Sequence, residues 1–326
     1  MATALWASEI RPGLPPVARP ASEFFDAASY RADDWLLYHL AVGAEMGEQL
    51  FVRGERLIIN HHNVTPPHYF DSWMPAMAEN LEVGEAQVVK LATRAHLGIG
   101  DSKFNADALI DAGCANTVVA PVFVDVERLG PPRELRDVQR ARRTKTKWLF
   151  VGRVAPNKAI HDVITAFAWY RMGCDPAATL TIVGGMPADR YADAIRRLVA
   201  RLDLLDAVEF AGSVSDHELG DFYRSADVYT SCSEHEGFGV PIIEAMYMGV
   251  PVVALDAAAI GETSAGAALL VDRADPALFA AAAFRACAHE PLRSELLARG
   301  RRRADDLGVA AVRARWREVL SALVGN

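Results

Sequence analysis

The stretch DVYTSCSEHEGFGVPIIEA, residues 227–245, decides the fold, because an apolar run, a glycine-containing loop and a proline follow one another. The run DVYTS (227–231) is typical of a strand that is covered on both faces of a sheet. Two glycines follow in the loop, and Pro241 suits the first turn of a helix, which Gly249 ends. The stretch therefore predicts a strand, a loop and a helix in succession, which is the repeating unit of a parallel sheet.

The same alternation extends through the second half of the chain. Short β-rich runs, each followed by glycine or a polar turn, are separated by segments with one apolar face. One such segment begins at Ser215 and has Glu218 three residues later, which is a capping box. This alternation predicts a parallel, doubly wound sheet whose ligands bind at the carboxyl ends of its strands. The predicted strands are 148–152, 179–185, 207–212, 227–231, 251–255 and 268–272.

The first half of the chain repeats this pattern more sparsely. It has no GxGxxG motif and no opening strand with a glycine-rich turn, so we expect its domain to be incomplete at the start. The overall prediction is an α/β protein with two Rossmann-like, doubly wound domains that face each other across a cleft. The predicted strands of the first domain are 35–40, 56–62, 96–102 and 117–122.

A segment rich in proline and charge, residues 129–147, marks the boundary between the two domains. We predict a first domain over 1–138 and a second domain over 139–305. The final segment, 306–326, is predicted as a helix that crosses back to the first domain or contacts a membrane.

Composition excludes several classes of function. The formal net charge of −8 argues against a nucleic-acid partner, because phosphate backbones are bound by clustered positive charge. The four cysteines form no CxxC pair, which fits reduced thiols in a cytoplasmic protein better than a metal site or a disulfide framework. No apolar stretch approaches the ~18 to 20 residues that span a bilayer, although contact with the inner face of a membrane is left as an alternative.

Arg153 and Lys158 lie on the loop VGRVAPNK, which follows the first strand of the second domain. Such a loop can direct both side chains into the crevice at the strand ends, where two cations would bind a pyrophosphate. A solvated loop with surface cations explains the same pattern equally well.

Glu236 and Glu244 flank the loop and helix start in the opening stretch. Backbone amides at a helix N-terminus suit an anion or sugar hydroxyls, and Gly237 and Gly239 allow a ligand close to the backbone. The carboxylate of Glu244 would suit the cis-diol of a ribose. The alternative is that both acids simply stabilise the positive end of a helix.

Several histidines end strand-like runs in the first domain, at the edge that is expected to face the crevice. His62 is the strongest of them, followed by His39 and His61, although a histidine in a sheet is more often a structural group. Asp101 and Ser102 face the cleft or form a structural turn.

These residues carry a family resemblance. GRVAPNK, followed by EHEGFGVPIIEA, resembles the donor-binding signature of family 4 (group 1) glycosyltransferases, which have the two-domain GT-B fold, and Glu236 and Glu244 match its E-x7-E element. HHNVTPPHYF (61–70) resembles the HN-x-TP segment in the first domain of some members, and GDSKFNADALIDAG (100–113) resembles the stretch that follows it. The resemblance covers nearly the whole chain from about residue 30.

The resemblance implies a retaining transfer from a UDP- or GDP-sugar to a glycan, a lipid-linked or a small-molecule acceptor. Glu236 and His62 would be catalytic. No DxD triplet occurs in the sequence, so we expect neither a metal nor another cofactor. The remaining implied site residues are Arg153, Lys158, Gly212, Ser213, Val214, Gly237, Phe238, Gly239, Val240 and Glu244 for the donor, and His39, Asn63 and Ser102 for the acceptor side.

Within this set, Arg153 and Lys158 would neutralise the diphosphate and Glu244 would hold the ribose, while Gly212 to Val214 would border the base. Two alternatives stay open. One is a nucleotide-sugar-binding module without turnover, because the first domain looks incomplete, and the other is a related GT-B epimerase or phosphorylase.

Overall fold

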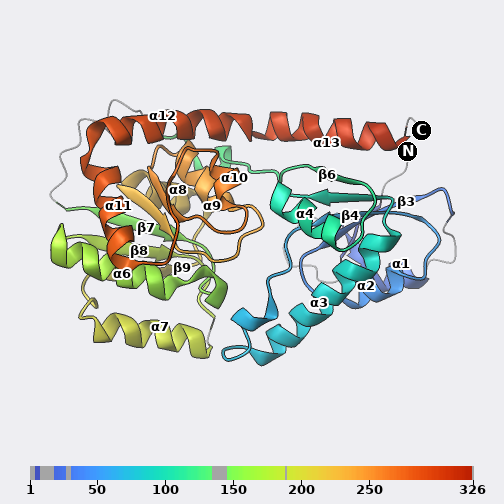
Figure 1. Cartoon of the computed structure of the whole chain (residues 1–326), viewed down its shortest axis with the longest axis horizontal. Helices are drawn as coiled ribbons and strands as arrows, with labels where there is room; N and C mark the ends of the chain where they lie inside the picture. Colours follow the sequence, from blue (N-terminus) through green and yellow to red (C-terminus); the bar gives the residue numbers. More distant parts are fainter. Residues whose placement is uncertain (1–3, 8–17, 27–30, 134–144, 188, 325–326) are drawn as a thin grey trace.

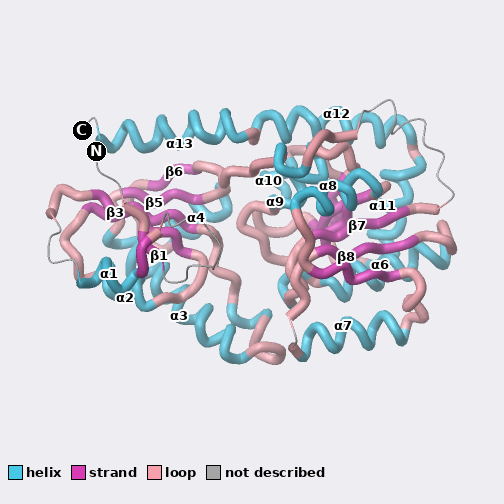
Figure 2. The backbone as a smooth tube through the Cα atoms, turned by 180° about the vertical axis from the view of Figure 1, so that it is seen from behind, coloured by secondary structure: helices cyan, strands magenta, loops and turns pink. Residues whose placement is uncertain are grey.

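The computed structural model describes residues 4–7, 18–26, 31–133, 145–187 and 189–324. They form two lobes that lie side by side, each with a parallel sheet, and two consecutive helices run along one side of both lobes (Figure 1). Seen from behind, loops lie between the strands of the two sheets at the centre of the molecule (Figure 2). The predicted α/β fold with a parallel sheet in each of two lobes is therefore confirmed.

The second lobe is built on a six-stranded parallel sheet in the order β12-β11-β10-β7-β8-β9. A cluster of buried side chains covers each face of this sheet, and most of the strand residues within the clusters are apolar. Trp148 packs edge-on against Phe167 and Tyr170 in one of these clusters. All the strands predicted for this half are confirmed. They are β7 (Lys147–Val151), β8 (Thr179–Val183), β9 (Val208–Gly212), β10 (Val228–Ser231), β11 (Val252–Leu255) and β12 (Leu269–Val271).

Helices of the second lobe begin where local sequence signals predict. Ser215 and Glu218 exchange side-chain and backbone hydrogen bonds, so the predicted capping box is confirmed. Asp275 likewise caps a helix that has Pro276 at its first position. The helices are α6 (Ile160–Gly173), α7 (Arg190–Arg201), α8 (Asp216–Ser225), α9 (Val240–Tyr247), α10 (Ile260–Ser264), α11 (Pro276–Ala288), α12 (Glu290–Asp306) and α13 (Val309–Val324).

The first lobe is built on a four-stranded parallel sheet in the order β3-β4-β5-β6, and its predicted strands are confirmed. The long helix α3 was not predicted, and its buried face carries Leu81, Val88 and Leu91. A short pair of strands, β1 and β2, lies beside α1, where Trp6 contacts Phe24. The elements are β1 (Trp6–Ala7), β2 (Arg19–Pro20), α1 (Ala21–Asp26), β3 (Trp35–Leu40), α2 (Glu45–Leu50), β4 (Arg56–His61), α3 (Pro75–Arg94), β5 (Leu97–Gly100), α4 (Lys103–Asp111) and β6 (Thr117–Val119).

Helix α13 returns from the second lobe to the first and packs against its sheet (Figure 1). Nε of Arg315 donates to the carbonyl oxygen of Val119 at 3.0 Å, and Nε1 of Trp316 donates to that of Pro121 at 3.0 Å. Val319 is buried in a cluster with strands of the first sheet. The end of the chain therefore holds the two lobes together.

The segment that joins the sheets packs with the second lobe. Val124, Val126 and Leu129 are buried in the cluster that also contains side chains of α8 and α9. Leu129 closes a 3₁₀ turn, η2 (Glu127–Leu129). The predicted domain boundary at 138/139 lies outside the described residues.

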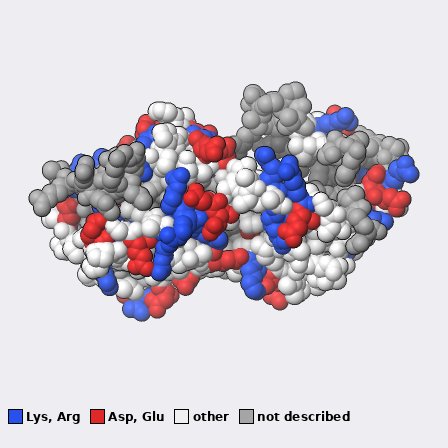
Figure 3. Space-filling view, turned by 90° about the horizontal axis from the view of Figure 1, so that it is seen from above, with Lys and Arg blue, Asp and Glu red and all other residues white. Residues whose placement is uncertain are grey.

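Charges of both signs are interspersed on the face that carries α12 and α13, which is seen from above in Figure 3. Arg299 pairs with Glu295, and Arg315 pairs with Glu318. These arginines therefore have acidic neighbours and do not form a uniformly basic strip. In the part of the chain that the structure describes, we find no helix that combines the length and apolarity needed to cross a bilayer.

Truncating Val319 tests how α13 is held. Val319→Ala removes buried apolar volume against the first sheet, so we expect a loss of about 1 to 3 kcal/mol of stability and a melting midpoint lower by a few degrees in calorimetry. The matched control is Leu320→Ala, because Leu320 is 38% exposed on the same helix and should change the midpoint little. Equal effects of the two variants would contradict the packing described for α13.

Candidate functional site

The carboxyl ends of strands from both sheets meet at the centre of the molecule. Asn63 follows β4 and Asn105 lies in α4, directly after β5, whereas Gly237 lies in the loop after β10. Nδ2 of Asn105 donates to the carbonyl oxygen of Gly237 at 3.2 Å. Doubly wound sheets bind ligands at the carboxyl ends of their strands, so this meeting point is the candidate site.

Gly237 is required here by close approach. A Cβ at this position would lie 2.5 Å from Cβ of Asn63 and 3.0 Å from Nδ2 of Asn105, which leaves no room for a side chain. Gly239 has a different role, since its φ of 89° is in the left-handed region and it is the N-cap of α9. The two predicted loop glycines thus permit the lobe contact and the turn into α9, and Phe238 between them is buried.

Lys158 and Glu236 form an ion pair with Nζ and Oε1 2.6 Å apart. Lys158 ends the 3₁₀ turn η3 (Pro156–Lys158), and both side chains keep some exposure, 23% for lysine and 17% for glutamate. Asn157 joins the loop after β7 to the loop after β10. Its Nδ2 donates to the backbone carbonyl of His235, and its backbone carbonyl accepts from the amide of Glu234. The structure therefore brings the predicted cation and the predicted sugar-binding acid together at one edge.

The other predicted donor residues lie at the same edge. Arg153 is exposed on the loop after β7. Gly212 ends β9 with φ of 69°, and Ser213 and Val214 follow it. A Cβ on Gly185, after β8, would lie 3.5 Å from Oγ of Ser213, so the loops after these two strands are neighbours.

Glu244 lies about one turn after Val240, the first residue of α9, and is only 2% exposed. Its Oε1 contacts Nη2 of Arg128, and its Oε2 accepts a hydrogen bond from the Tyr223 hydroxyl at 2.9 Å. Burial raises the pKa of Glu244, whereas the Tyr223 hydrogen bond and Arg128 oppose that rise. Sequence reasoning missed Arg128 and Tyr223, because neither is marked by a local motif.

Two histidines and an aspartate form a chain in the first lobe. Nδ1 of His62 lies 2.6 Å from Oδ2 of Asp101, and Nε2 of His62 lies 2.7 Å from Nδ1 of His39. When Nδ1–H of neutral His62 donates a hydrogen bond to Asp101, Nε2 of His62 carries no proton. It can then accept a hydrogen bond from Nδ1–H of His39. Burial lowers the pKa of His39, and the neighbouring His62 lowers it further. The predicted site residues His62 and His39 are therefore hydrogen-bonded to each other.

Other first-lobe residues have structural contacts. Ser102 is buried, and its hydroxyl accepts from the amide of Asn105 as the N-cap of α4. His61 is buried, and its Nε2 accepts from the amide of Val64. Asn63 adopts φ of 75° and lies against Gly237.

The sequence was compared with models of known families. The model described as "Glycosyl transferases group 1" matches residues 132–303, which is more than half of the chain. The chain belongs to this family. The match includes Arg153, Lys158, Glu236 and Glu244, the residues on which the resemblance rests.

Curated relatives agree with the group 1 assignment. The D-inositol 3-phosphate glycosyltransferase of Kineococcus radiotolerans is 34% identical over 70% of this chain and 57% of its own length. A protein of the same name from Frankia alni is 33% identical over 70% of this chain and 58% of its own length. The chain spans about half the length of the curated relatives it matches.

Solved structures show that the fold of this chain is GT-B. Sucrose-phosphate synthase of Thermosynechococcus elongatus has a TM-score of 0.75 at 21% identity and covers 97% of this chain and 83% of its own. Anabaena HepE in complex with UDP has a TM-score of 0.68 at 22% identity, covering 85% and 75% of the two chains.

His235, in the loop between β10 and α9, packs against rings of the first lobe. Its ring stacks on Tyr69 at 6.2 Å and meets Phe104 edge-on at 5.6 Å. Its Nε2 is buried and has no hydrogen-bond partner among the described residues. Burial lowers the pKa of His235 to about 4, Glu236 opposes this, and Lys158 adds to it. The ring is therefore neutral near pH 7.

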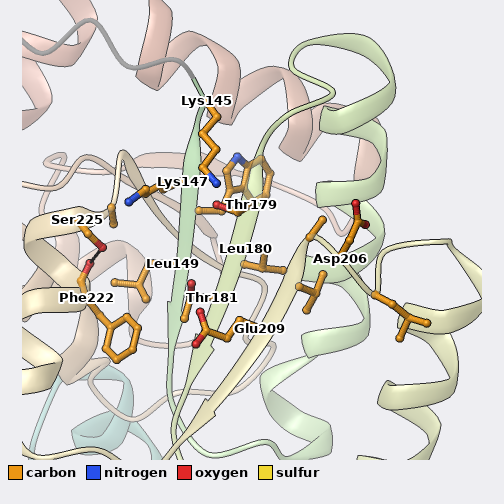
Figure 4. Close-up of a pocket in the computed structure, with 15 residues that line it drawn as sticks. Lys145, Lys147, Leu149, Thr179, Leu180, Thr181, Asp206, Glu209, Phe222 and Ser225 are labelled. Atoms are coloured by element: carbon orange, nitrogen blue, oxygen red, sulfur yellow. Dashed lines mark hydrogen bonds between the residues drawn. The ribbon is translucent and has the colours of Figure 1, made fainter.

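A pocket of about 560 Å³ lies at the amino ends of strands in the second sheet, opposite the candidate site (Figure 4). Lys147 lines it at the start of β7, Thr179 at the start of β8 and Val208 at the start of β9. Lys158 and Glu236 instead follow the carboxyl ends of β7 and β10. Strand polarity therefore argues against this pocket as the donor site.

Among the described residues, no group of three or more His, Cys, Asp and Glu side chains could hold a metal ion.

Gly237→Ala tests the contact between the lobes. The new Cβ must retreat by about 0.9 Å to move from 2.5 Å to the 3.4 Å of an ordinary contact with Asn63. Such overpacking costs about 1 to 3 kcal/mol, so we expect amide hydrogen exchange at 103–106 and 236–239 to accelerate at least about fivefold. Gly173→Ala is the control, because no atom lies within 4 Å of a Cβ there. Unchanged exchange in Gly237→Ala would contradict the contact.

His235 predicts a pH dependence. The unfolded chain takes up the proton near pH 6.5 and the folded chain only near about 4, so this contribution to stability is present above pH 6.5 and is lost as the pH falls toward 4. That difference corresponds to about 3 kcal/mol. We expect His235→Phe to lose less stability than the unmodified chain between pH 7 and pH 4.5 in urea unfolding. An equal loss in both proteins would show that His235 is not the group responsible.

Proposed function

We propose that the chain transfers a sugar, with retention of configuration, from a nucleoside-diphosphate sugar to an acceptor hydroxyl. The observation that carries this proposal is the Lys158–Glu236 ion pair, which lies where the carboxyl edges of both sheets meet, just before α9. The cation and the N-terminus of α9 suit the charge that develops on a leaving diphosphate. Glu236 suits the hydroxyls of the sugar.

Names of similar proteins support a nucleotide-sugar donor. Structures of Anabaena HepE contain UDP, UDP with glucose, and UDP-glucose. The curated relatives are named as glycosyltransferases. We therefore propose a UDP- or GDP-sugar as the donor of this chain.

In the proposed reaction, the bond between the anomeric carbon and the diphosphate breaks, and the electron pair leaves with the diphosphate. The acceptor oxygen forms the new bond to the anomeric carbon on the same face, and its hydroxyl proton passes to the leaving diphosphate. Lys158 and Arg153 would stabilise the charge that appears there, which favours the transition state over the bound donor. Because Lys158 is paired with Glu236 before the donor arrives, the diphosphate must share or replace that carboxylate. Two protein cations in this position support our proposal that no metal is needed.

We place the acceptor in a cavity of about 780 Å³ between the lobes. Tyr69 and Trp73 line it from the first lobe and Tyr191 from α7, while Glu234 places it beside the signature loop. Aromatic rings with a few polar groups are typical of a site for a largely buried organic ligand. This lining is compatible with a sugar ring of a glycan, of a lipid-linked acceptor or of a small molecule.

Replacing each of the two glutamates by glutamine is expected to have a different effect on nucleotide affinity. Glu236→Gln frees Lys158 from a competing carboxylate, so the affinity for bare UDP or GDP should stay equal or rise several-fold while transfer is lost. Glu244→Gln removes ribose contacts and should weaken binding about tenfold or more. Isothermal titration calorimetry measures both affinities. Equal weakening in the two variants would contradict the division of roles.

Turnover separates this proposal from a donor-binding module. The chain is incubated with radiolabelled UDP-glucose or GDP-mannose and a mixture of candidate acceptors, and released nucleotide and labelled product are measured. Donor binding without either product in a folded sample would favour the module. Isomerisation of the sugar without an acceptor would favour an epimerase.

A further inference from the structure

Arg128 bridges two carboxylates of the second lobe from the segment that joins the sheets. Its Nη2 contacts Oε1 of Glu244 in α9, and its Nη1 contacts Oδ1 of Asp216, the first residue of α8. The Tyr223 hydroxyl lies 2.9 Å from the other oxygen of Glu244. Each oxygen of Glu244 is therefore held by a different donor.

The position of Arg128 is fixed by the backbone beside it. Leu129 is fully buried, and its carbonyl oxygen accepts from Nη1 of Arg224 at 3.0 Å. A Cβ on Gly220, in α8, would lie 2.1 Å from that same oxygen, so the helix tolerates the segment only with glycine there. The joining segment thus packs closely against α8, and this contact fixes the backbone next to Arg128.

Arg128 also affects the charge of Glu244. The glutamate is 2% exposed, and burial by itself favours the protonated carboxyl. Arg128 and Tyr223 favour the ionised form, which accepts hydrogen bonds on both oxygens. Removing Arg128 would leave a buried carboxylate with one strong partner.

We infer that Arg128 is a positioning residue for recognition of the donor ribose through Glu244, an inference that rests on the proposed function. An ionised carboxylate has about four lone-pair sites, so one contact to each oxygen leaves room for both ribose hydroxyls. Arg128 and Tyr223 each hold one oxygen and so fix the plane of the carboxylate. The joining segment therefore belongs to the nucleotide site.

The test compares UDP with 2′,3′-dideoxy-UDP, and GDP with its dideoxy analogue, by calorimetry. Two hydrogen bonds to a charged group should make the unmodified chain prefer the intact ribose by about tenfold or more. Arg128→Gln should reduce that preference below about threefold and change the affinity for the dideoxy compound by less than about threefold. Arg128→Lys, which keeps the charge but not the fork, should be intermediate.

Glu244→Gln completes a double-mutant cycle. If Arg128 acts through Glu244, the two substitutions together should reduce the ribose preference no more than the larger single effect. Arg196→Gln is the matched control, since it removes an exposed arginine on α7 and should leave the preference unchanged. Melting curves establish that each variant is folded.

The outcomes separate the inference from the proposed function. A preference retained in Arg128→Gln, an equal loss of affinity for both ligands, or additive effects in the cycle would overturn the role of Arg128. Binding of UDP or GDP by the unmodified chain without any ribose preference would overturn the inference and the ribose role of Glu244, but not the proposed sugar transfer. Binding of neither nucleotide would overturn the proposed function and the inference with it.

Discussion

The architecture of the site depends on one close approach, that of the Gly237 backbone to Asn63 and Asn105. Nδ2 of Asn105 lies 3.2 Å from the carbonyl oxygen of Gly237, and a Cβ at position 237 would lie 2.5 Å from Cβ of Asn63. The Gly237 backbone of one lobe therefore contacts the other lobe directly. This contact brings the carboxyl ends of the two sheets together. The residues on each side, His62 in the first lobe and Glu236 in the second, can therefore serve one ligand.

Paired charges make up the second lobe's part of the site. Lys158 and Glu236 are partly exposed and paired with each other, so an incoming diphosphate can compete for the lysine. Glu244 is the more buried of the two carboxylates, with a side chain 3% exposed against 17% for Glu236, and both Arg128 and the Tyr223 hydroxyl hold it. The first pair is suited to change when the donor binds, and the second is suited to stay in place.

The sequence predicted those parts of the molecule that local signals determine. The apolar strands, the capping box at Ser215 and the helix start at Pro241 all depend on neighbouring residues, and the structure confirms them. Arg128 could not be predicted, because its partner Glu244 lies 116 positions away. Ser102 was predicted to face the cleft or to form a structural turn, and its role as the N-cap of α4 was not predicted.

Hydrogen exchange with and without UDP or GDP tests most directly whether the meeting carboxyl edges form the donor site. The account predicts that a bound nucleotide slows exchange at the backbone amides of 153–158 and 236–240, on the loops after β7 and β10. Protection at the amino ends of β7, β8 and β9 instead, around the pocket of Figure 4, or no protection at all in a folded sample, would contradict it.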